Sequence, residues 1–373
     1  MRTVLADRMS KIEPSGIRRI FELMTTMDDP INFSIGQAHY DPPAELVDAA
    51  CRAMRDGFNR YTMTQGMSEL NERVLAQVAQ RYGHRPDACF ITSGVSGGIL
   101  LAFIALLNPG DEILLPDPNF MMYRHLASLT GAEARFYNLY PDFQPDPAEI
   151  EDLVTDKTKI IFINSPSNPT GGVLSEAAID AVVRAADRVG AYVISDEIYD
   201  AFVYDDHYAT PVGKTERVIQ LSGFSKTYGV PGWRMGYVTG PVDVLDAMKT
   251  LQQFSFVCAP APFQRAILEV AFDLDMSAYI EEYRAKRNRL VAGLHESFEL
   301  VPPGGSFYAF PKIPAGVDES AFMDACLERK LLVVPGSAFS RVATHFRLSF
   351  AVNDEDLTRG IEALNDVALQ FSR

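Results

Sequence analysis

The chain is poor in cysteine and in long apolar runs. Its four cysteines are widely spaced and form no C-x-x-C pair: Cys51, Cys89, Cys258 and Cys326. Such spacing fits neither a disulfide framework nor a zinc site, so we expect no metal, and it is typical of a reducing compartment.

The most apolar stretch, residues 99–107, is far shorter than the ~20 residues of a membrane-spanning helix, and the charged N-terminus lacks the apolar core of a signal peptide. We therefore expect a cytoplasmic protein with no membrane partner.

Basic side chains are also in deficit, with 34 Lys and Arg residues against 49 Asp and Glu residues and a formal net charge of -15 at pH 7. A surface of this sign repels nucleic acid and anionic membranes, so neither is an expected partner. Any anionic ligand would need a pocket made locally positive by a few Arg and Lys side chains.

The 373 residues, of which 47% are hydrophobic, suffice for one large domain and a smaller one. The middle of the chain alternates short apolar runs with longer amphipathic stretches. The candidate strands are residues 89–92, 112–116, 159–164, 191–195 and 218–222. Strands that alternate with helices predict an α/β domain with a mainly parallel sheet covered by helices on both faces. We assign residues 41–275 to this large domain.

The pattern changes near residue 275. Helical stretches at about 279–298 and 319–330 alternate with short apolar runs, and a last helical stretch ends the chain. This arrangement predicts a smaller α+β domain made of residues 276–373 together with the N-terminal segment 1–40.

Polar segments follow the candidate strands. In chain order they are SGVSGG (93–98), DPNF (117–120), NSPSNPTGG (164–172), DEIYD (196–200) and GFSKTYG (223–229). In open parallel sheets, ligands bind at the carboxyl ends of the strands. These five loops are therefore expected to meet at one edge of the sheet and to form a single site.

Four longer motifs carry a specific resemblance. They are NSPSNPTG (164–171), SDEIY (195–199), SKTYGVPGWRMGY (225–237) and FRLSF (346–350). In this order and spacing they resemble the class I and II aminotransferases, which are fold type I enzymes dependent on pyridoxal 5'-phosphate. The resemblance implies a seven-stranded type of sheet flanked by helices, and it implies pyridoxal 5'-phosphate as the cofactor.

The resemblance assigns three catalytic residues, Lys226, Asp196 and Tyr199. Lys226 matches the family's Schiff-base lysine, because the cofactor is an aldehyde and imine formation requires a nucleophilic amine. Asp196 matches the carboxylate that pairs with the pyridine nitrogen and keeps the ring able to accept electrons. Tyr199 and Asn168 match residues that hydrogen-bond the ring hydroxyl oxygen. In isolation, a surface lysine, a strand-terminal Asp and an Asn-Pro turn would be the commoner explanations.

Further residues match the family's contacts to the cofactor phosphate. Arg234 matches its arginine, whose fixed fork of donors suits a phosphate. Val95 and Ser96 would present backbone N–H groups at a helix N-terminus, and Ser225 belongs to the same cofactor-binding set. Tyr61 matches a tyrosine that reaches the phosphate of the partner subunit, so the active unit is expected to be a homodimer.

The resemblance also implies how the ring and the substrate are held. Phe120 matches the aromatic residue that stacks on the cofactor ring, although a core residue is the alternative. Arg347 matches the arginine that grips the substrate α-carboxylate in bidentate fashion. Gly36 matches a backbone donor to the same carboxylate, and Asn168 also lies in the substrate-binding set.

Taken together, the resemblance implies an aminotransferase that moves the amino group of an L-amino acid to a 2-oxo acid by a ping-pong mechanism through a Lys226 Schiff base. Its partners would be these small molecules. A C–S β-lyase or a related lyase or synthase would use the same residues, so the motifs leave that alternative open. A non-catalytic, cofactor-binding regulator would need a DNA-binding segment, and the acidic balance disfavours it.

The chain departs from the family near the expected substrate. Many members have Pro-Asp after the glycine that matches Gly36, whereas residues 36–40 here are Gly-Gln-Ala-His-Tyr. The sequence offers no clear second Arg or Lys for a distal carboxylate. Phe120, Met121 and Met122 predict an apolar, adaptable side-chain site.

Overall fold

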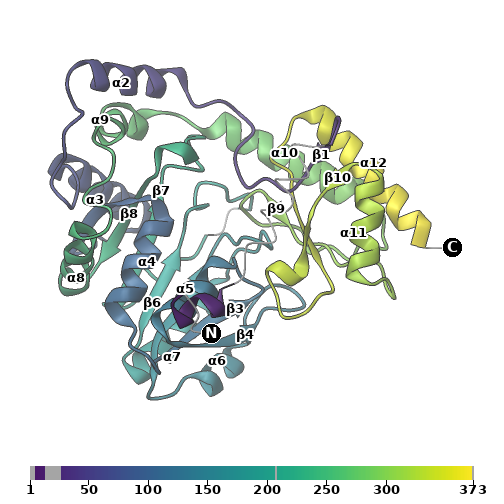
Figure 1. Cartoon of the computed structure of the whole chain (residues 1–373), viewed down its shortest axis with the longest axis horizontal. Helices are drawn as coiled ribbons and strands as arrows, with labels where there is room; N and C mark the ends of the chain where they lie inside the picture. The colour runs from purple at the N-terminus through teal and green to yellow at the C-terminus, as the bar shows by residue number, and fades with distance from the viewer. Residues whose placement is uncertain (1–4, 13–26, 206–207, 372–373) are drawn as a thin grey trace.

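The computed structural model describes residues 5–12, 27–205 and 208–371. The fold is α/β, as predicted, with a central sheet flanked by helices and a smaller group of short strands and helices beside it (Figure 1). In Figure 1 the smaller group, coloured mostly green to yellow, lies on the right and carries the C-terminus.

Within the described ranges the central sheet has seven strands, in the order β2-β8-β7-β6-β5-β3-β4. They are β2 (Ala88–Ser93), β3 (Glu112–Asp117), β4 (Glu133–Asn138), β5 (Thr158–Asn164), β6 (Tyr192–Asp196), β7 (Val218–Gly223) and β8 (Met235–Gly240). Of these strands, β8 runs antiparallel to its two neighbours and the others are parallel to one another. The five strands expected from the sequence are all present, so the prediction of a mainly parallel sheet is confirmed.

Burial explains which strands the sequence reveals. Every residue of β3 and β7 is buried, because helices cover both faces of the sheet, and the strands EILLPD and VIQLSG are rich in apolar residues. β4 lies at the edge of the sheet, and its sequence EARFYN is mostly half-buried or exposed. The sequence pattern predicts neither β4 nor the glycine-rich β8, because both lack that apolar signal.

Helices connect and cover these strands. They are α2 (Ala44–Arg55), α3 (Ser68–Tyr82), α4 (Gly94–Leu106), α5 (Met122–Thr130), α6 (Pro147–Leu153), α7 (Glu176–Val189), α8 (Val242–Gln253) and α9 (Ala261–Val270). Capping fixes the predicted helix α7, since the Ser175 side chain accepts a hydrogen bond from the Ala178 N–H and Gly190 ends the helix with φ 71°. No helix in the described part of the chain is long and apolar enough to cross a membrane.

The smaller group joins distant parts of the chain. β1 (Ile31–Asn32) pairs in parallel with β10 (Leu331–Leu332), so the N-terminal segment packs on the C-terminal region. The other strands form an antiparallel sheet, β11 (Val334–Pro335), β12 (Phe346–Ser349) and β9 (Tyr308–Ala309). The helices of this group are α10 (Ser277–Gly293), α11 (Glu319–Glu328) and α12 (Asp354–Phe371), and the short 3-10 helix η4 (Gly336–Ala338) lies between β11 and β12. Three other 3-10 helices accompany the large domain: η1 (Asp7–Lys11) contacts α5, η2 (Pro231–Trp233) precedes β8, and η3 (Ala271–Asp273) follows α9.

Candidate active site

The predicted loops meet at the carboxyl edge of the parallel strands and enclose a cavity of about 250 Å³. The structure brings eleven of the twelve predicted site residues into its wall: Gly36, Val95, Ser96, Phe120, Asn168, Asp196, Tyr199, Ser225, Lys226, Arg234 and Arg347. The twelfth, Tyr61, lies elsewhere. Other surface cavities are larger, but this one gathers three basic side chains and a buried carboxylate, which is the arrangement that binds and activates anionic substrates.

Lys226 stands in the turn that follows β7. Its Nζ donates a hydrogen bond to the Gly36 carbonyl oxygen at 2.7 Å. Burial, and then the nearby guanidinium groups of Arg347 and Arg234, lower the pKa of Lys226 to about 8, against an opposing effect of Asp196. An amine with this pKa is partly neutral near pH 7 and therefore nucleophilic.

Asp196 ends β6 and is buried in the cavity wall. Its Oδ2 accepts a hydrogen bond from the Tyr123 hydroxyl at 2.8 Å, and its Oδ1 accepts one from the Ile198 N–H at 3.2 Å. Burial raises the pKa of Asp196 to about 6, while these hydrogen bonds act in the opposite direction. Among the described residues no Arg or Lys forms an ion pair with it, so the carboxylate suits a cationic partner such as a protonated ring nitrogen.

The phosphate end is built at the start of α4. The cap residue Ser93 makes no side-chain hydrogen bond to the helix, which leaves the first N–H groups at Val95 and Ser96 available to an anion. Arg234 reaches the same point and donates from Nη2 to the Ser93 carbonyl oxygen at 3.3 Å. Gly94 has φ +68°, a conformation that favours glycine, and a Cβ at this position would lie 2.5 Å from the Arg234 Nη2 atom, so the guanidinium would have to move. A guanidinium over a helix N-terminus fits a phosphate group.

Arg347, on β12, is fully enclosed at the other end of the cavity. It donates from Nη1 to the Asn168 Oδ1 at 3.0 Å and from Nη2 to the Ser34 carbonyl oxygen at 2.6 Å. Its guanidinium lies between the rings of Tyr308 and Phe339, 4.6 and 4.8 Å from their centroids. Its Nε has no hydrogen-bond partner in the described part of the chain. A buried N–H donor without an acceptor costs free energy of folding, and a carboxylate ligand would supply the missing acceptor.

Aromatic side chains make the rest of the wall. The Tyr199 and Tyr308 hydroxyls lie 3.1 Å apart, and burial raises the pKa of Tyr199 well above its usual value. Phe120 is half-buried in the wall and packs edge-on against Tyr123 at 5.9 Å between ring centroids. Ser225 is buried beside Lys226. Aromatic walls of this kind suit a planar ring.

Met122 lines the cavity beside Phe120, as the predicted apolar site requires, whereas Met121 does not. The sequence did not identify four lining residues, Tyr123, Ile198, Pro231 and Tyr308. Tyr123 carries a weak signal, because it lies at the start of α5, three residues after Phe120 and next to Met122. Tyr308 belongs to the two-residue strand β9, far from the other loops in the chain. Only the tertiary packing of the small sheet brings it to the cavity.

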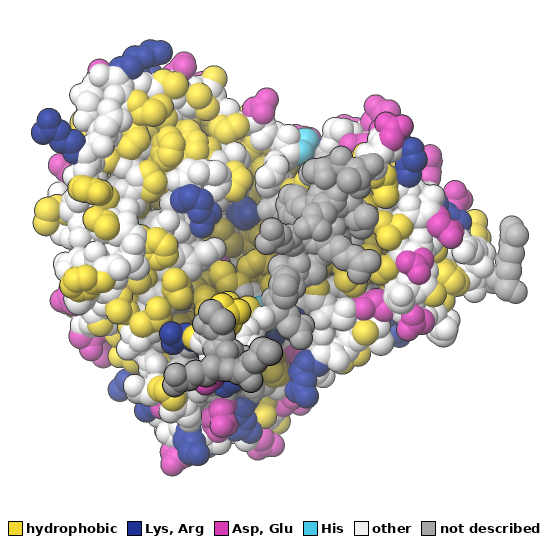
Figure 2. Space-filling model, viewed as in Figure 1, with side chains coloured by type: hydrophobic (Ala, Val, Ile, Leu, Met, Phe, Trp, Pro, Cys, Tyr) yellow, Lys and Arg dark blue, Asp and Glu magenta, His cyan; other side chains and the backbone are white. Residues whose placement is uncertain are grey.

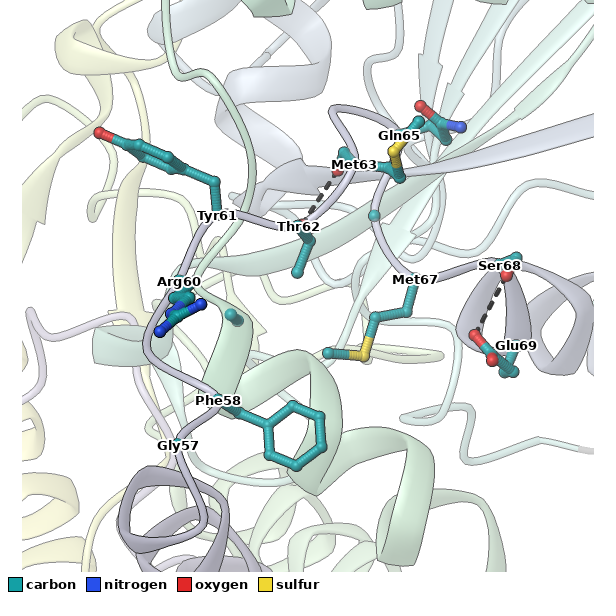
Figure 3. Close-up of a pocket in the computed structure, with 12 residues that line it drawn as sticks. Gly57, Phe58, Arg60, Tyr61, Thr62, Met63, Gln65, Met67, Ser68 and Glu69 are labelled. Carbon is teal, nitrogen blue, oxygen red and sulfur yellow. Dashed lines mark hydrogen bonds between the residues drawn. The ribbon is translucent and has the colours of Figure 1, made fainter.

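Tyr61 does not line this cavity. It lies on the segment between α2 and α3, and Figure 3 shows its ring directed away from Phe58 and Met67. The side chain is 83% exposed in the single chain. The prediction that Tyr61 serves the partner subunit therefore stays a prediction.

Comparisons with known proteins agree with this geometry. The model of the family "Aminotransferase class I and II" matches residues 28–364. A probable aspartate aminotransferase of Methanocaldococcus jannaschii is 32% identical over 98% of this chain and 100% of its own. An aromatic-amino-acid aminotransferase 2 of Thermococcus litoralis is 31% identical over 97% and 98%. The solved structure of an aspartate aminotransferase from Thermotoga maritima has a TM-score of 0.92 and 31% identity, covering 98% of this chain and 100% of that one.

The fold is therefore that of the fold type I enzymes that depend on pyridoxal 5'-phosphate. Within that class, the chain belongs to the class I and II aminotransferase family and is a transaminase that uses this cofactor.

Proposed function

We propose that Lys226 attaches the cofactor covalently and moves the proton at the substrate Cα during transfer of an amino group from an L-amino acid to a 2-oxo acid. The observation that carries this proposal is the enclosed Lys226 amine, with a pKa lowered to about 8, in one cavity with Asp196 and Arg234. When bound, pyridoxal 5'-phosphate supplies the electron sink for the substrate Cα. The amine donates one hydrogen bond to the Gly36 carbonyl, so its lone pair stays available to accept a proton.

The remaining residues orient the reactants. Asp196 would hold the proton on the ring nitrogen, and Tyr199 with Asn168 would hydrogen-bond the ring hydroxyl oxygen. Phe120 would cover the ring. Val95, Ser96, Ser225 and Arg234 would hold the phosphate, a role that the uncapped start of α4 supports.

Arg347 would bind the substrate α-carboxylate, together with the Gly36 backbone. Its unpaired Nε and its place between two rings support this role, because a guanidinium held in one plane is preorganised for a bidentate carboxylate. The three basic side chains in the described part of the wall, Lys226, Arg234 and Arg347, are then all engaged by the cofactor or by the α-carboxylate. We therefore propose that the preferred amino donor has an uncharged side chain, since a second carboxylate would be buried without a counter-ion.

A half-reaction test distinguishes transamination from the reaction of a C–S β-lyase. Holoenzyme mixed with a single L-amino acid and no oxo acid should give one equivalent of 2-oxo acid per site and then stop, without ammonia. Addition of a second 2-oxo acid should restart turnover. Continuous release of 2-oxo acid and ammonia would instead show a β-lyase and overturn the proposal. The same assay with leucine, phenylalanine and aspartate as donors tests the side-chain preference.

We also propose a homodimer. Large apolar side chains are exposed in the single chain, among them Tyr61, Met63 and Phe254, the last with 86% of its side chain accessible. The two segments that carry them adjoin, because the Gln252 Nε2 donates to the Thr64 carbonyl oxygen at 2.6 Å. Figure 2 shows apolar side chains spread over the left of this face. An exposed patch of this kind is typical of an interface.

Mixed dimers test the dimer and the role of Tyr61 together. Lys226→Ala and Tyr61→Ala chains, each inactive or weak alone, should form a mixed dimer with one intact site if Tyr61 serves its partner. Recovery of activity on co-expression is the expected result. A fully active monomer in sedimentation analysis would contradict the proposal.

Two further assignments remain proposals, namely the domain limits and the cytoplasmic location. The division into 41–275 and 1–40 with 276–373 is supported by the pairing of β1 with β10, although residues 1–4 and 13–26 lie outside the described part. Limited proteolysis that cuts near residues 40 and 275 would support the division. Cell fractionation tests the location.

A further inference from the structure

We propose that a cluster of His39, Glu282 and the buried Lys286 positions the Lys226 amine by holding the segment of residues 36–40. We call it the His39 cluster. The inference rests on the proposed role of Lys226, and it concerns the segment in which this sequence departs from the family pattern. His39 and Lys286 are positioning residues here, because neither lines the cavity.

Lys286 is the centre of the cluster. It lies on α10, and only 2% of its side chain is exposed. Its Nζ lies 2.6 Å from the Glu282 Oε1, 2.9 Å from the His39 Nε2 and 2.5 Å from the Val352 carbonyl oxygen. An ammonium group has three N–H donors, and these three atoms can accept all of them. A buried charge satisfied in this way is costly to disturb, because removing one acceptor leaves a donor unpaired.

The arrangement requires His39 to accept at Nε2. The Nδ1 proton can then go to the Tyr283 hydroxyl, which lies 3.0 Å away and also accepts from the His39 backbone N–H at 3.0 Å. A protonated His39 could not accept from Lys286 and would turn its Nε2–H to Glu282, which is 3.0 Å away. Protonation therefore breaks the bond that ties the segment of residues 36–40 to Lys286.

Several charged groups face His39. Burial and then Lys286 lower the pKa of His39, whereas Glu282 and the more distant Asp354, at the start of α12, act to raise it. The aromatic rings of Tyr40 and Tyr283 pack against the imidazole. Because the pKa is lowered in the folded protein, the neutral, accepting form is present at neutral pH and is lost as pH falls below the usual value of about 6.5.

The segment of residues 36–40 touches Lys226 at two places. At one end, the Gly36 carbonyl accepts from the Lys226 Nζ at 2.7 Å. At the other end, the Tyr40 hydroxyl lies 3.0 Å from the Lys226 carbonyl oxygen and 2.8 Å from that of Thr227. His39 lies between these contacts in the chain and is hydrogen-bonded to α10, against which the Tyr40 ring also packs. A shift of His39 would therefore move the carbonyl that fixes the reactive amine.

Gly36 has little freedom to adjust. A Cβ at this position would lie 2.4 Å from the Tyr308 hydroxyl oxygen, so the backbone passes close to a residue of the cavity wall. A small displacement of this segment would change both the Lys226 contact and the room beside Arg347. Misplacement of a catalytic group by about 1 Å can cost about 100-fold in rate.

The test uses the holoenzyme and four variants. Lys286→Met removes the charge and keeps the length of the side chain, and Lys286→Arg keeps the charge. His39→Gln keeps an acceptor for Lys286 but cannot be protonated in this range. Lys312→Met is the matched control, because Lys312 is a half-exposed lysine paired with Glu299 outside the cavity. For each variant, kcat, KM and the absorbance of the bound cofactor are measured between about pH 5 and 8.

We expect Lys286→Met to lower kcat about 10- to 100-fold, to shift the pH dependence of the cofactor absorbance, and to be partly rescued by Lys286→Arg. His39→Gln should match the wild type near pH 8 and lose less activity than the wild type as pH falls. Lys312→Met should change neither kcat nor the pH dependence of the cofactor absorbance. If Lys286→Met does not fold, His39→Gln decides alone.

Wild-type kcat and an unchanged pH dependence in both Lys286→Met and His39→Gln would overturn the inference. That outcome is distinct from failure of the proposed function, which would appear as full activity in Lys226→Ala. A drop in thermal stability of the Lys286 variants with unaltered kcat and absorbance would show a structural role only, and it too would overturn the inference.

Discussion

Asp196 and its neighbour Glu197 are both buried carboxylates, yet they face opposite sides of the same strand end. Glu197 accepts hydrogen bonds from the Ser195 hydroxyl at 2.8 Å, the Thr210 hydroxyl at 2.7 Å and the Gln220 amide at 2.7 Å. Among the residues that the structure describes, the Asp196 carboxylate accepts only the bonds from Tyr123 and Ile198 given above, and it faces the cavity. Burial raises the pKa of both groups.

The difference separates scaffold from site. On the Glu197 side, the fold supplies neutral donors for the carboxylate, as buried polar groups require. On the Asp196 side, the fold leaves a carboxylate, an amine and a guanidinium with unfilled hydrogen-bonding capacity. Cofactor and substrate can supply the missing partners. Substitutions in the cavity should therefore damage function and spare stability, whereas substitutions on the Glu197 side should do the reverse.

The largest effect is expected for Asp196→Asn. Loss of the carboxylate should lower kcat/KM about 10²- to 10³-fold, because its charge acts on the ring at a buried, preorganised position. The protein without cofactor should be at least as stable as the wild type at pH 7, since a buried, incompletely paired charge is removed. Because the folded pKa of Asp196 is raised to about 6, wild-type stability should fall as pH rises from 4 through 6 relative to the variant. Thermal melts across this range measure it.

The second largest effect is expected for Arg347→Lys. A lysine cannot offer a planar pair of donors, so KM for the amino donor should rise about 10- to 100-fold with a smaller change in kcat. Steady-state kinetics with a fixed oxo acid measure the split. An unchanged KM would contradict the role of Arg347 and would weaken the contrast between site and scaffold.

Glu197→Gln is the counterpart on the scaffold side. An amide offers one acceptor oxygen where the carboxylate offers two, so one of three buried donors loses its partner and stability should fall by about 1–3 kcal/mol. Denaturant unfolding measures this loss. The kcat per folded molecule should stay within a few-fold of the wild type; a loss as large as that of Asp196→Asn would show that the two sides are not separate.

The smallest effect among the cavity variants is expected for Tyr123→Phe. It removes one hydrogen bond to Asp196 and raises the pKa of that carboxyl further, so kcat/KM should fall about tenfold. Tyr140→Phe, whose hydroxyl contacts Ser340 outside the cavity, is the control and should leave kcat/KM unchanged. Equal kcat/KM for Tyr123→Phe and Tyr140→Phe would show that the Tyr123 hydroxyl has no role in the site.

The sequence predicts the parts of this molecule that depend on local pattern. Buried strands such as β5, TKIIFIN, contain apolar runs. The rule that ligands gather at the carboxyl ends of parallel strands places Asp196, Lys226 and Asn168 at one site from the sequence alone. The edge strand β4 is too polar to be recognised, because one side of it is not covered. The contact of Tyr308 with Tyr199 spans 109 residues of chain and that of His39 with Lys286 spans 247, and no local pattern reports packing over such separations.

The central claim is that the Lys226 amine forms the covalent bond to the cofactor. Borohydride reduction of the loaded wild-type protein, followed by digestion and mass spectrometry, should place a phosphopyridoxyl group on the peptide that contains Lys226, and Lys226→Ala should lose both that adduct and about 10³-fold or more of the activity. An adduct on another lysine, or a fully active Lys226→Ala protein, would contradict the account.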